Sequence, residues 1–485
     1  MNNQRNKYIL LFTLIAAVFT SCKNQWDSHD TITDPALGVT VLQQINNNAD
    51  LSKFSQYLAQ TGYDKVIAGS KTFTVWAPTN AAITAALTID ATIATDTGKL
   101  KRFVGNHISY QLYPTSLPQP SVRVKMLNGK SITFTKTKFE DANIVLSNIY
   151  SSNGLLHTID QAIIPKLNIW DYIKSLTTVG AKQRAYLLSQ NYLHQDTTRA
   201  KQIGVDALTG RPIYDPTSAI DTLNYYISST QNIKSEDKQF TYFVLTDAAF
   251  DAETNKVLPY FATAVPQSST LLANYNVTKD LAIPGLITLN NLPDTIISPF
   301  NVKVPINKAN IVQTYNASNG IVYVISSVPY RLKDKITPIV IQGESTIGFS
   351  RSDKAGNILY RTKLDNNGVP FSDIFIETNG TGTLTALFSA LYFVPNMNSV
   401  SYKVYWRAIN DRAVAFSQQL NFGTSTAATF PYTLVPLLNY SETLIGTYTV
   451  TQYGSQFMFL TGANNTTSGT NSLSLDYVKL IPVLP

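Results

Sequence analysis

Cysteine is almost absent from this chain of 485 residues. Cys22 is the only one, so no disulfide bridge can form within the chain and no metal site can be built on several thiolates. The four histidines, His29, His107, His157 and His194, are far apart in the sequence, and no two of them have a spacing typical of metal ligands. We therefore expect no metal and no other cofactor.

Charge is also scarce, since Asp, Glu, Lys and Arg together make up 14% of the residues. The formal net charge is +7, but the basic residues are scattered, and no run of them is interleaved with aromatic residues. This distribution argues against nucleic acid as a partner. The many Tyr, Phe, Asn, Thr and Ser residues favour β-rich extracellular modules over a helical cytosolic enzyme.

Long hydrophobic runs are missing except for Tyr8–Phe19. This run has about 12 residues, whereas a membrane-spanning helix needs about 20. Arg5 and Lys7 precede the run, and the small residues Thr20 and Ser21 follow it. A basic start, a short apolar run and a small-residue boundary are typical of a secretory signal peptide.

Cys22 directly follows this segment, an arrangement that resembles the lipobox of bacterial lipoproteins. The resemblance implies that residues 1–21 are a lipoprotein signal peptide, that Cys22 is diacylated, and that residues 22–36 form a tether. Acyl chains contribute about 0.8 kcal/mol per buried methylene, so several of them anchor a protein stably to a membrane. The alternative is a plain signal peptide with an incidental cysteine. In lipoproteins of this kind, acidic residues directly after the cysteine are a signal for export to the cell surface. Here the first acidic residues are Asp27 and Asp30, so both the cell surface and the periplasmic face of the membrane are possible locations.

The remaining length of about 460 residues suggests roughly three domains, and the first two are copies of one module. Three collinear blocks align at an offset of 167 positions, or 166 after one deletion: residues 71–83 with 238–250, 142–145 with 309–312, and 152–157 with 318–323. A period this long indicates duplicated domains, because solenoid repeats run for about 20–50 residues.

Each block also predicts local structure. Thr72–Trp76 is β-branched and aromatic, which predicts a strand. Thr79 or Asn80 then caps a following helix, and Thr246 does so in the second copy. Asn153–Gly154 and its counterpart in the second copy predict hairpin turns between strands.

These residues resemble the fasciclin domain. Thr74–Ala82 is similar to the first sequence box of that family, Asn153–Asp160 to the second, and Asn106–Ile108 to the short histidine motif between them. The resemblance implies α+β modules, each with a β-sandwich or wedge flanked by helices, that act in adhesion and extracellular binding. We assign residues 37–166 to the first fasciclin-like domain.

Residues 167–333 form the second, diverged copy. Leu245, Tyr323 and Ser326 stand where the first copy has proline, histidine and aspartate, and a polar insertion occupies residues 191–235. We expect the fold to be retained, and whether this copy keeps a binding role stays open.

The histidines of the first copy, His107 and His157, raise the question of catalysis. No Gly-x-Ser-x-Gly motif and no second cysteine offers a nucleophile. Both histidines have apolar neighbours, Ile108 and Leu156. Hydrogen-bonded structural histidines explain this better than catalytic ones.

A charged stretch, Arg331–Lys335, followed by Pro338 predicts a linker to a third domain, residues 337–485. Roughly nine short strands separated by turn residues predict an all-β jelly roll or β-sandwich. The closing segment, Asn471–Leu480, resembles the last strand of galactose-binding-like carbohydrate modules. That resemblance implies a carbohydrate-binding module.

Alternation along Ser401–Ala408 separates two faces of one strand of this domain. The predicted core face carries large apolar side chains: Tyr402, Val404 and Trp406. The other face is either an ordinary solvated face or a binding face, since Tyr and Arg stack on sugars and hydrogen-bond them. The candidate glycan-binding residues are on that face or at exposed strand ends: Lys403, Tyr405, Arg407, Tyr440 and Tyr453.

We therefore expect a lipid-anchored outer-membrane protein without enzymatic activity. Its layout resembles the accessory binding lipoproteins of glycan-uptake systems in Bacteroidetes, which implies polysaccharide, a porin-like transporter and a capture lipoprotein as partners. The alternative is a structural adhesin or scaffold that binds envelope or host proteins. A hydrolase in the sandwich would need two carboxylates about 5–9.5 Å apart, and nothing in the sequence pairs Asp373, Glu377 or Asp476.

Overall fold

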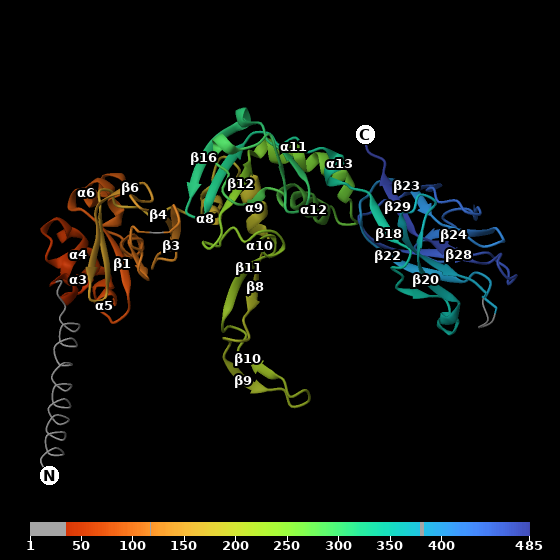
Figure 1. Ribbon diagram of the computed structural model, residues 1–485, viewed down its shortest axis with the longest axis horizontal. Helices are drawn as coiled ribbons and strands as arrows, with labels where there is room; N and C mark the ends of the chain where they lie inside the picture. The colour runs from red at the N-terminus through yellow and green to blue at the C-terminus, as the bar shows by residue number, and fades with distance from the viewer. Residues whose placement is uncertain (1–34, 117, 379–382) are drawn as a thin grey trace, which may run out of the picture. The chain divides into compact units, whose positions relative to one another are not determined.

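The computed structural model describes residues 35–116, 118–378 and 383–485 (Figure 1). The predicted signal peptide, Cys22 and most of the tether lie outside the described residues. The chain forms two compact units. Of the described residues, the first unit comprises those in 35–172, 234–239 and 316–320, and the second comprises those in 173–233, 240–315 and 321–485.

The first repeat copy is a mixed α+β domain. Its helices, including short 3-10 turns, are η1 (Pro35–Gly38), α3 (Val41–Asn46), η2 (Ala49–Leu51), α4 (Ser52–Thr61), α5 (Tyr63–Ile67), α6 (Asn80–Ile89), η3 (Ala91–Ile93) and α7 (Thr97–Gly105). Its strands are β1 (Phe73–Pro78), β2 (Ile108–Tyr110), β3 (Ser121–Lys125), β4 (Ser131–Thr135), β5 (Lys138–Phe139), β6 (Ala142–Ser151) and β7 (Gly154–Ile159). They hydrogen-bond in the order β2-β1-β7-β6-β5-β4-β3.

Strand β1 lies between β2 and β7 in this sheet, and all six of its residues are buried. It pairs with β2 in antiparallel and with β7 in parallel orientation. Phe73, Val75 and Ala77 pack into the cluster formed with the helices, whereas Trp76 packs into a second cluster on the other face. The predicted strand is confirmed, and burial on both faces explains why the segment is apolar except for Thr74, whose hydroxyl donates to the carbonyl of Gln111 at 2.7 Å.

The predicted helix cap is also confirmed. The side chain of Thr79 accepts a hydrogen bond from the backbone N–H of Ala82 at 3.1 Å and so begins α6. In the second copy Thr246 accepts from the N–H of Ala249 and begins α11 (Asp247–Val257). Each cap satisfies one of the N–H groups that have no partner within the helix.

The hairpin corner between β6 and β7 does more than turn the chain. The side-chain oxygen of Asn153 accepts from the N–H of Val41 at 3.0 Å, and its amide donates to the carbonyl of Ile67 at 2.7 Å. At Gly154, a Cβ atom would lie 2.3 Å from the carbonyl oxygen of Phe73. Only glycine fits this close approach, so the Asn-Gly pair ties the turn to α3 and to β1.

The second copy has helices α8 (Ile169–Ser175), α9 (Ala181–Ser189), α10 (Tyr225–Ser229), α11, η4 (Leu258–Phe261), α12 (Pro266–Thr278), η5 (Leu289–Asn291), η6 (Lys308–Asn310) and α13 (Leu332–Lys335). Its strands are β8 (Asn191–Gln195), β9 (Gln202–Val205), β10 (Pro212–Tyr214), β11 (Ile220–Asn224), β12 (Phe240–Leu245), β13 (Ala282–Pro284), β14 (Thr295–Ile297), β15 (Lys303–Pro305), β16 (Ile311–Ala317) and β17 (Gly320–Ile325).

The central sheet of the second copy repeats the arrangement of the first. Its order is β13-β12-β17-β16, with β12 and β17 in the places of β1 and β7. The N–H of Thr246 donates to the carbonyl of Ile325 at 3.0 Å, as that of Thr79 donates to Ile159 at 3.2 Å. Asn319 accepts from the N–H of Ile169 at 2.9 Å, which repeats the anchoring role of Asn153.

The insertion at residues 191–235 includes a β-ribbon that projects from α9 and α10 (Figure 1). Strand β8 pairs with β11 and β9 pairs with β10, each as a separate two-stranded sheet. Several aliphatic side chains of this ribbon are exposed, among them Leu193 (74%) and Leu208 (97%). The segment predicted as a polar insertion is thus a structured ribbon with apolar side chains in contact with solvent.

The C-terminal domain is all-β, as predicted. Its strands are β18 (Ile339–Gln342), β19 (Gly348–Phe349), β20 (Ile358–Leu364), β21 (Pro370–Ile376), β22 (Ser389–Met397), β23 (Ser401–Arg407), β24 (Phe416–Phe422), β25 (Thr433–Val435), β26 (Thr443–Thr449), β27 (Gly454–Gly462), β28 (Leu473–Leu475) and β29 (Tyr477–Pro482); η7 (Ser352–Asn357) is a 3-10 segment. The two larger sheets have the orders β18-β29-β23-β26 and β19-β22-β27-β24-β25, and β20-β21-β28 form a third.

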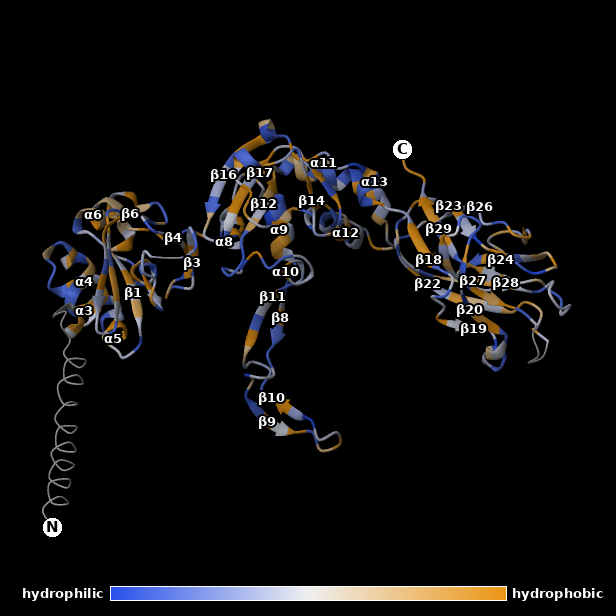
Figure 2. Ribbon diagram, viewed as in Figure 1, coloured by the Kyte–Doolittle hydropathy of each residue, from blue (hydrophilic) through white to orange (hydrophobic). Residues whose placement is uncertain are grey.

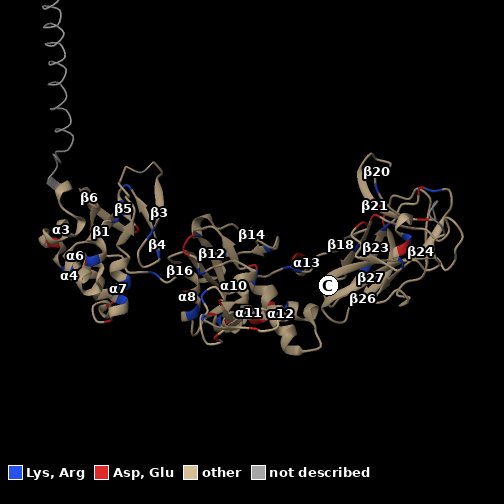
Figure 3. Cartoon of the chain, turned by 90° about the horizontal axis from the view of Figure 1, so that it is seen from below, with Lys and Arg blue, Asp and Glu red and all other residues tan. Residues whose placement is uncertain are grey.

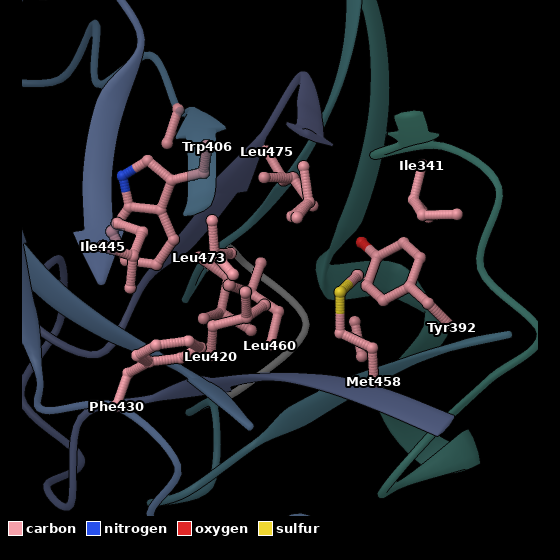
Figure 4. Close-up of a cluster of buried hydrophobic side chains, with 14 of the residues drawn as sticks. Ile341, Tyr392, Trp406, Leu420, Phe430, Ile445, Met458, Leu460, Leu473 and Leu475 are labelled. Carbon is pink, nitrogen blue, oxygen red and sulfur yellow. The ribbon is translucent and has the colours of Figure 1, made fainter. Parts of the chain in front are cut away.

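One hydrophobic core joins these sheets. Trp406, Leu420, Tyr392 and Met458 point toward one another in Figure 4, and each is at most 1% exposed. Apolar colouring follows the strands, most clearly β18 and β29 (Figure 2). Burying such side chains stabilises the fold by about 1.5–3 kcal/mol each.

The charged stretch that we expected to be a linker includes helix α13, which ends in a buried ion pair. The Nζ atom of Lys335 lies 2.5 Å from a carboxylate oxygen of Asp280 and 2.6 Å from the carbonyl oxygen of Asn276. Both charged side chains are fully buried. Lys335 therefore packs as part of the second domain, because a buried charge needs a partner to be tolerated.

Candidate functional site

The predicted alternation along β23 is confirmed. Tyr402, Val404 and Trp406 are buried, whereas Lys403 is exposed and Tyr405 and Arg407 are half-buried on the opposite face. On the neighbouring strand β29, Ile481, Lys479 and Tyr477 are the register partners of these three outward residues. The outer face of this sheet therefore carries aromatic and basic side chains side by side.

The outer face ends in an open cleft of about 550 Å³ at the Arg407 end of β23. The cleft lies where β18, β20, β21, β23 and the junction of β28 with β29 come together. Its lining residues are Gln342, Glu344, Thr362, Pro370, Phe371, Ser372, Arg407, Asp476 and Tyr477. Most of them offer a hydroxyl, amide or charged group, and Phe371 lies buried among them.

Arg407 organises this cleft. Its guanidinium contacts Asp476 at 2.5 Å and Asp365 at 3.1 Å, and its Nε donates to the carbonyl of Tyr440 at 2.8 Å. The guanidinium also lies over the ring of Phe371, 4.9 Å from the ring centre. A planar group with several donors suits this task, because it can serve two carboxylates and an aromatic face at once. Sequence reasoning proposed Arg407 as a ligand contact, and the structure commits most of its donors to the protein.

The rim of the cleft is held by hydrogen bonds around Glu442. Tyr477 donates its hydroxyl hydrogen to Glu442 at 2.8 Å, and the Nζ atom of Lys479 lies 3.0 Å from the same carboxylate. Burial and this carboxylate raise the pKa of Tyr477 to about 12, so its hydroxyl stays protonated at neutral pH. Burial raises the pKa of Asp476 as well, while Arg407 acts in the opposite direction.

The carboxylates that a hydrolase would need are each paired with an arginine. Both oxygens of Asp373 contact Arg361, at 2.5 and 2.8 Å, and its side chain is fully buried. Glu377 is hydrogen-bonded to Arg412, and Asp476 to Arg407. Each of the three carboxylates thus has a cationic partner, which a charge away from water needs.

Two tyrosines predicted as exposed at strand ends lie elsewhere than expected. Tyr440 is half-buried, and the edge of its ring meets Phe371 with 6.2 Å between the ring centres. Tyr453 is also half-buried, with its ring 5.1 Å from that of Phe261. The expectation of exposure is wrong for both, because neighbouring turn residues carry no information about packing against distant segments.

Of the predicted residues, Arg407 lines the cleft, and Tyr440 contacts two lining residues, Arg407 through its carbonyl and Phe371 through its ring. Lys403 and Tyr405 share the outer face but do not line the cleft, and Tyr453 lies apart. Sequence reasoning missed Phe371 and Tyr477 as site residues. The closing motif Asp476-Tyr477 contained a signal for Tyr477, whereas nothing near Phe371 marked it.

His107 and His157 are fully buried, as expected of structural histidines. Nδ1 of His107 donates to the carbonyl of Phe103 at 2.9 Å, and its Nε2 accepts from the N–H of Ile163 at 3.0 Å. Nε2 of His157 donates to the carbonyl of Tyr113 at 3.0 Å. Burial lowers the pKa of each to about 4, so both are neutral at pH 7.

Charges of both signs are interspersed along the described segments (Figure 3). Among those residues, no group of three or more His, Cys, Asp or Glu side chains is placed to hold a metal ion. Within the same part of the chain, none of the helices has the length and apolar character to span a bilayer.

Comparison with known proteins identifies the repeated module. The sequence model of the Fasciclin domain matches residues 49–165 and 217–329. Protein sll1483 from Synechocystis sp. is 27% identical over 145 residues, which is 28% of this chain and 77% of that protein.

Solved structures resemble separate parts of the chain. A FAS1 domain pair from the insect cell adhesion molecule Fasciclin I covers 60% of this chain and 100% of its own, with 14% identity and a TM-score of 0.24. The C-terminal CBM6 of LamC from Zobellia galactanivorans covers 30% of this chain and 99% of its own, with 11% identity and a TM-score of 0.21. A family 35 carbohydrate binding module from Clostridium thermocellum has the same coverage, with 16% identity and a TM-score of 0.22.

Proposed function

Because the chain carries two fasciclin domains followed by a β-sandwich, we propose that it is a non-enzymatic binding protein of the bacterial cell envelope. In this proposal the sandwich binds polysaccharide, the protein is lipid-anchored at Cys22 in the outer membrane of a Bacteroidetes-type bacterium, and it assists a polysaccharide-uptake system. A transporter and a capture lipoprotein would be its neighbours. The fasciclin matches support the general role, since that family generally acts in adhesion and extracellular binding.

The observation that carries the glycan assignment is the cleft at the Arg407 end of β23. Its lining offers hydroxyl, amide and carboxylate groups together with the aromatic side chain of Tyr477, and the guanidinium of Arg407 is fixed over the buried ring of Phe371. Sugars present both hydroxyl groups and apolar ring faces, so polar groups beside an aromatic side chain complement them. The cleft is open, which favours an extended chain over a fully enclosed small molecule.

Calorimetry of the full chain against a panel of plant, host and bacterial polysaccharides tests this assignment. We expect weak binding, since a dissociation constant of about 1 mM corresponds to only about −4 kcal/mol. Tyr477→Ala removes the aromatic side chain at the rim and should weaken binding several-fold, for a loss of about 1 kcal/mol. Tyr405→Ala then tells whether the ligand continues along the outer face of the sheet.

The matched control is Phe393→Ala. Phe393 is 45% exposed on β22 in the other large sheet and does not line the cleft. If Phe393→Ala binds glycan as tightly as the unsubstituted chain and Tyr477→Ala binds it more weakly, the result supports the cleft as the glycan-binding site. Equal effects of the two variants, or no affinity for any glycan, would remove the glycan assignment.

The sequence of residues 1–22 is the sole support for the proposed lipid anchor. Cys22→Ala should release the protein from membrane fractions or leave its signal peptide uncleaved. Normal processing and continued membrane association of this variant would contradict the anchor. Protease shaving of intact cells then distinguishes the cell surface from the periplasmic face.

A second candidate function is that of a scaffold that binds envelope or host proteins without glycan affinity. The exposed aliphatic side chains of the β8–β11 ribbon favour it, because large exposed apolar groups mark interaction surfaces. Loss of a protein partner in pull-downs after Leu208→Ser, with no glycan bound by the full chain, would favour this alternative.

A further inference from the structure

The first fasciclin domain contains a cavity of about 470 Å³ that is separate from the sandwich cleft. Helix α5, strand β2 and the turn after β3 enclose it. Three tyrosines contribute to its wall: Tyr63, Tyr110 and Tyr113. Pockets of about 300–1,000 Å³ hold small ligands, so the size admits one or two sugar rings.

The tyrosines of this cavity are held in place by the domain. The hydroxyl end of Tyr63 lies 2.6 Å from where a Cβ atom on Gly105 would be, so the absence of that atom makes room for the ring. Tyr113 donates its hydroxyl hydrogen to the side-chain oxygen of Gln111 at 2.9 Å. Tyr110 is 46% exposed, and the ammonium of Lys71 lies 5.1 Å from the centre of its ring. The walls are therefore aromatic and already ordered.

Polar groups around these rings keep unused hydrogen-bonding capacity. Toward other described residues, the hydroxyls of Tyr63 and Tyr110 make no hydrogen bond, and the amide nitrogen of Gln111 makes none either. Burial and the neighbouring Tyr110 raise the pKa of Tyr63, so its hydroxyl remains a donor. Several donors next to aromatic faces suit a polyhydroxylated ring better than a purely apolar ligand.

Positive charge at the rim of the cavity further restricts the class of ligand that fits. Lys125 lines the cavity and Lys71 lies over Tyr110, so two ammonium groups stand close to the opening. Lys125 contacts Asp237 at 3.0 Å, but both side chains are about two-thirds exposed, at 65% and 69%. An exposed pair of this kind is weak, and two donors of the ammonium group remain for a ligand carboxylate.

We propose that this cavity is a second ligand site, which binds an acidic saccharide: a pyranose ring that carries a carboxylate. The ring stacks on Tyr110, its hydroxyl groups meet Tyr63 and Gln111, and its carboxylate faces Lys125 and Lys71. This site lies outside the sandwich and goes beyond the function proposed above.

Methionine NMR on the full chain tests the proposal at the site itself. The chain has four methionines, of which Met126 lines this cavity, whereas Met397 and Met458 lie in the sandwich core. Methyl-labelled protein is titrated with methyl β-D-glucuronide and with methyl β-D-glucoside, which differ only in the carboxylate. We expect the glucuronide to shift the Met126 signal with saturation in the millimolar range, and the glucoside to bind about threefold more weakly.

Matched variants locate the contact. Tyr110→Ala should weaken glucuronide binding about fivefold, whereas Tyr150→Ala, a 44% exposed tyrosine on β6 outside the cavity, should not change it. Lys125→Gln should remove the preference for the glucuronide, while Lys138→Gln, at an exposed lysine of β5, should retain it.

Three results would overturn the proposal: a Met126 signal that does not respond, equal affinity for both glycosides, or equal effects of Tyr110→Ala and Tyr150→Ala. Shifts confined to Met397 and Met458 would place binding in the sandwich. That outcome would leave the function proposed for the sandwich intact and refute the second site.

Discussion

At the scale of single residues, the two copies show how one structural role can be filled by different side chains. His157 donates to the carbonyl of Tyr113 and stacks on Trp76, with 5.7 Å between ring centres. In the second copy Tyr323 donates to the carbonyl of Ile287 at 2.9 Å and stacks on Phe243 at 5.8 Å. The second copy therefore keeps the hydrogen bond to a carbonyl and the aromatic stacking, and it replaces an imidazole with a phenol, whose usual pKa is about 10.

That difference predicts acid sensitivity of the first domain. His107 and His157 have a pKa of about 4 in the folded state, against about 6.5 when unfolded, so the unfolded chain binds more protons between these values. The contribution of the two neutral histidines to the free energy of unfolding is therefore fully present above about pH 6.5, and it decreases as the pH falls toward 4. The expected loss is about 2 kcal/mol per histidine by pH 5. Urea unfolding monitored at pH 7 and pH 5 measures it.

The variant His157→Tyr, which copies the second domain, should reduce this pH dependence whatever it does to stability at pH 7. His194→Gln is the control, since His194 is exposed on β8. An unchanged slope of stability against pH in His157→Tyr would contradict the assigned protonation state.

At the scale of elements, sequence patterns predicted the features that depend on neighbouring residues. They did not predict the features that depend on packing between segments far apart in the chain. The strand before Thr79, both N-caps and the Asn-Gly hairpins were predictable, because each depends on a few adjacent residues. The anchoring of α3 by Asn153 was not, since Val41 lies 112 positions away along the chain. Among the described residues, the sandwich has twelve strands where roughly nine were predicted, and the closing segment Asn471–Leu480, compared above with one last strand, is divided at Asp476 into β28 and β29. The same limit applies to the cleft, whose lining comes from five separate stretches of chain.

The hairpin corner gives a test at this scale. Gly154→Ala places a Cβ atom 2.3 Å from the carbonyl oxygen of Phe73 and 2.9 Å from a methyl group of Val41, so β1 or α3 must shift. Overpacking of this kind costs about 1–3 kcal/mol, and we expect the upper end because the nearest atom is backbone. The free energy of unfolding in urea measures the loss.

Gly38→Ala serves as the matched control, because nothing lies within 4 Å of a Cβ atom there. This substitution should be neutral or slightly stabilising through the unfolded state. Similar losses in the two variants would mean that the close approach at Gly154 does not matter to the fold.

At the scale of the whole molecule, α13 determines where the fasciclin pair ends. Asp280 and Lys335 are 55 positions apart and form a fully buried pair, and burial lowers the pKa of Lys335 to about 8 although Asp280 acts in the opposite direction. Ile336, the next residue, is also buried. A boundary drawn from composition alone, before Lys335, would leave the carboxylate of Asp280 buried without its cation.

We therefore predict that a fragment of residues 35–338 folds cooperatively and that a fragment of residues 35–333 is less stable by about 3–5 kcal/mol, the usual cost of removing one partner of a buried ion pair. Lys335→Met in the full chain should show a loss of the same order without any truncation. Chemical unfolding of the three proteins measures the differences, and the sandwich fragment 339–485 reports whether the remainder folds alone. Equal stability of the two longer fragments would mean that α13 belongs to the linker after all, and that Asp280 finds another partner or becomes protonated.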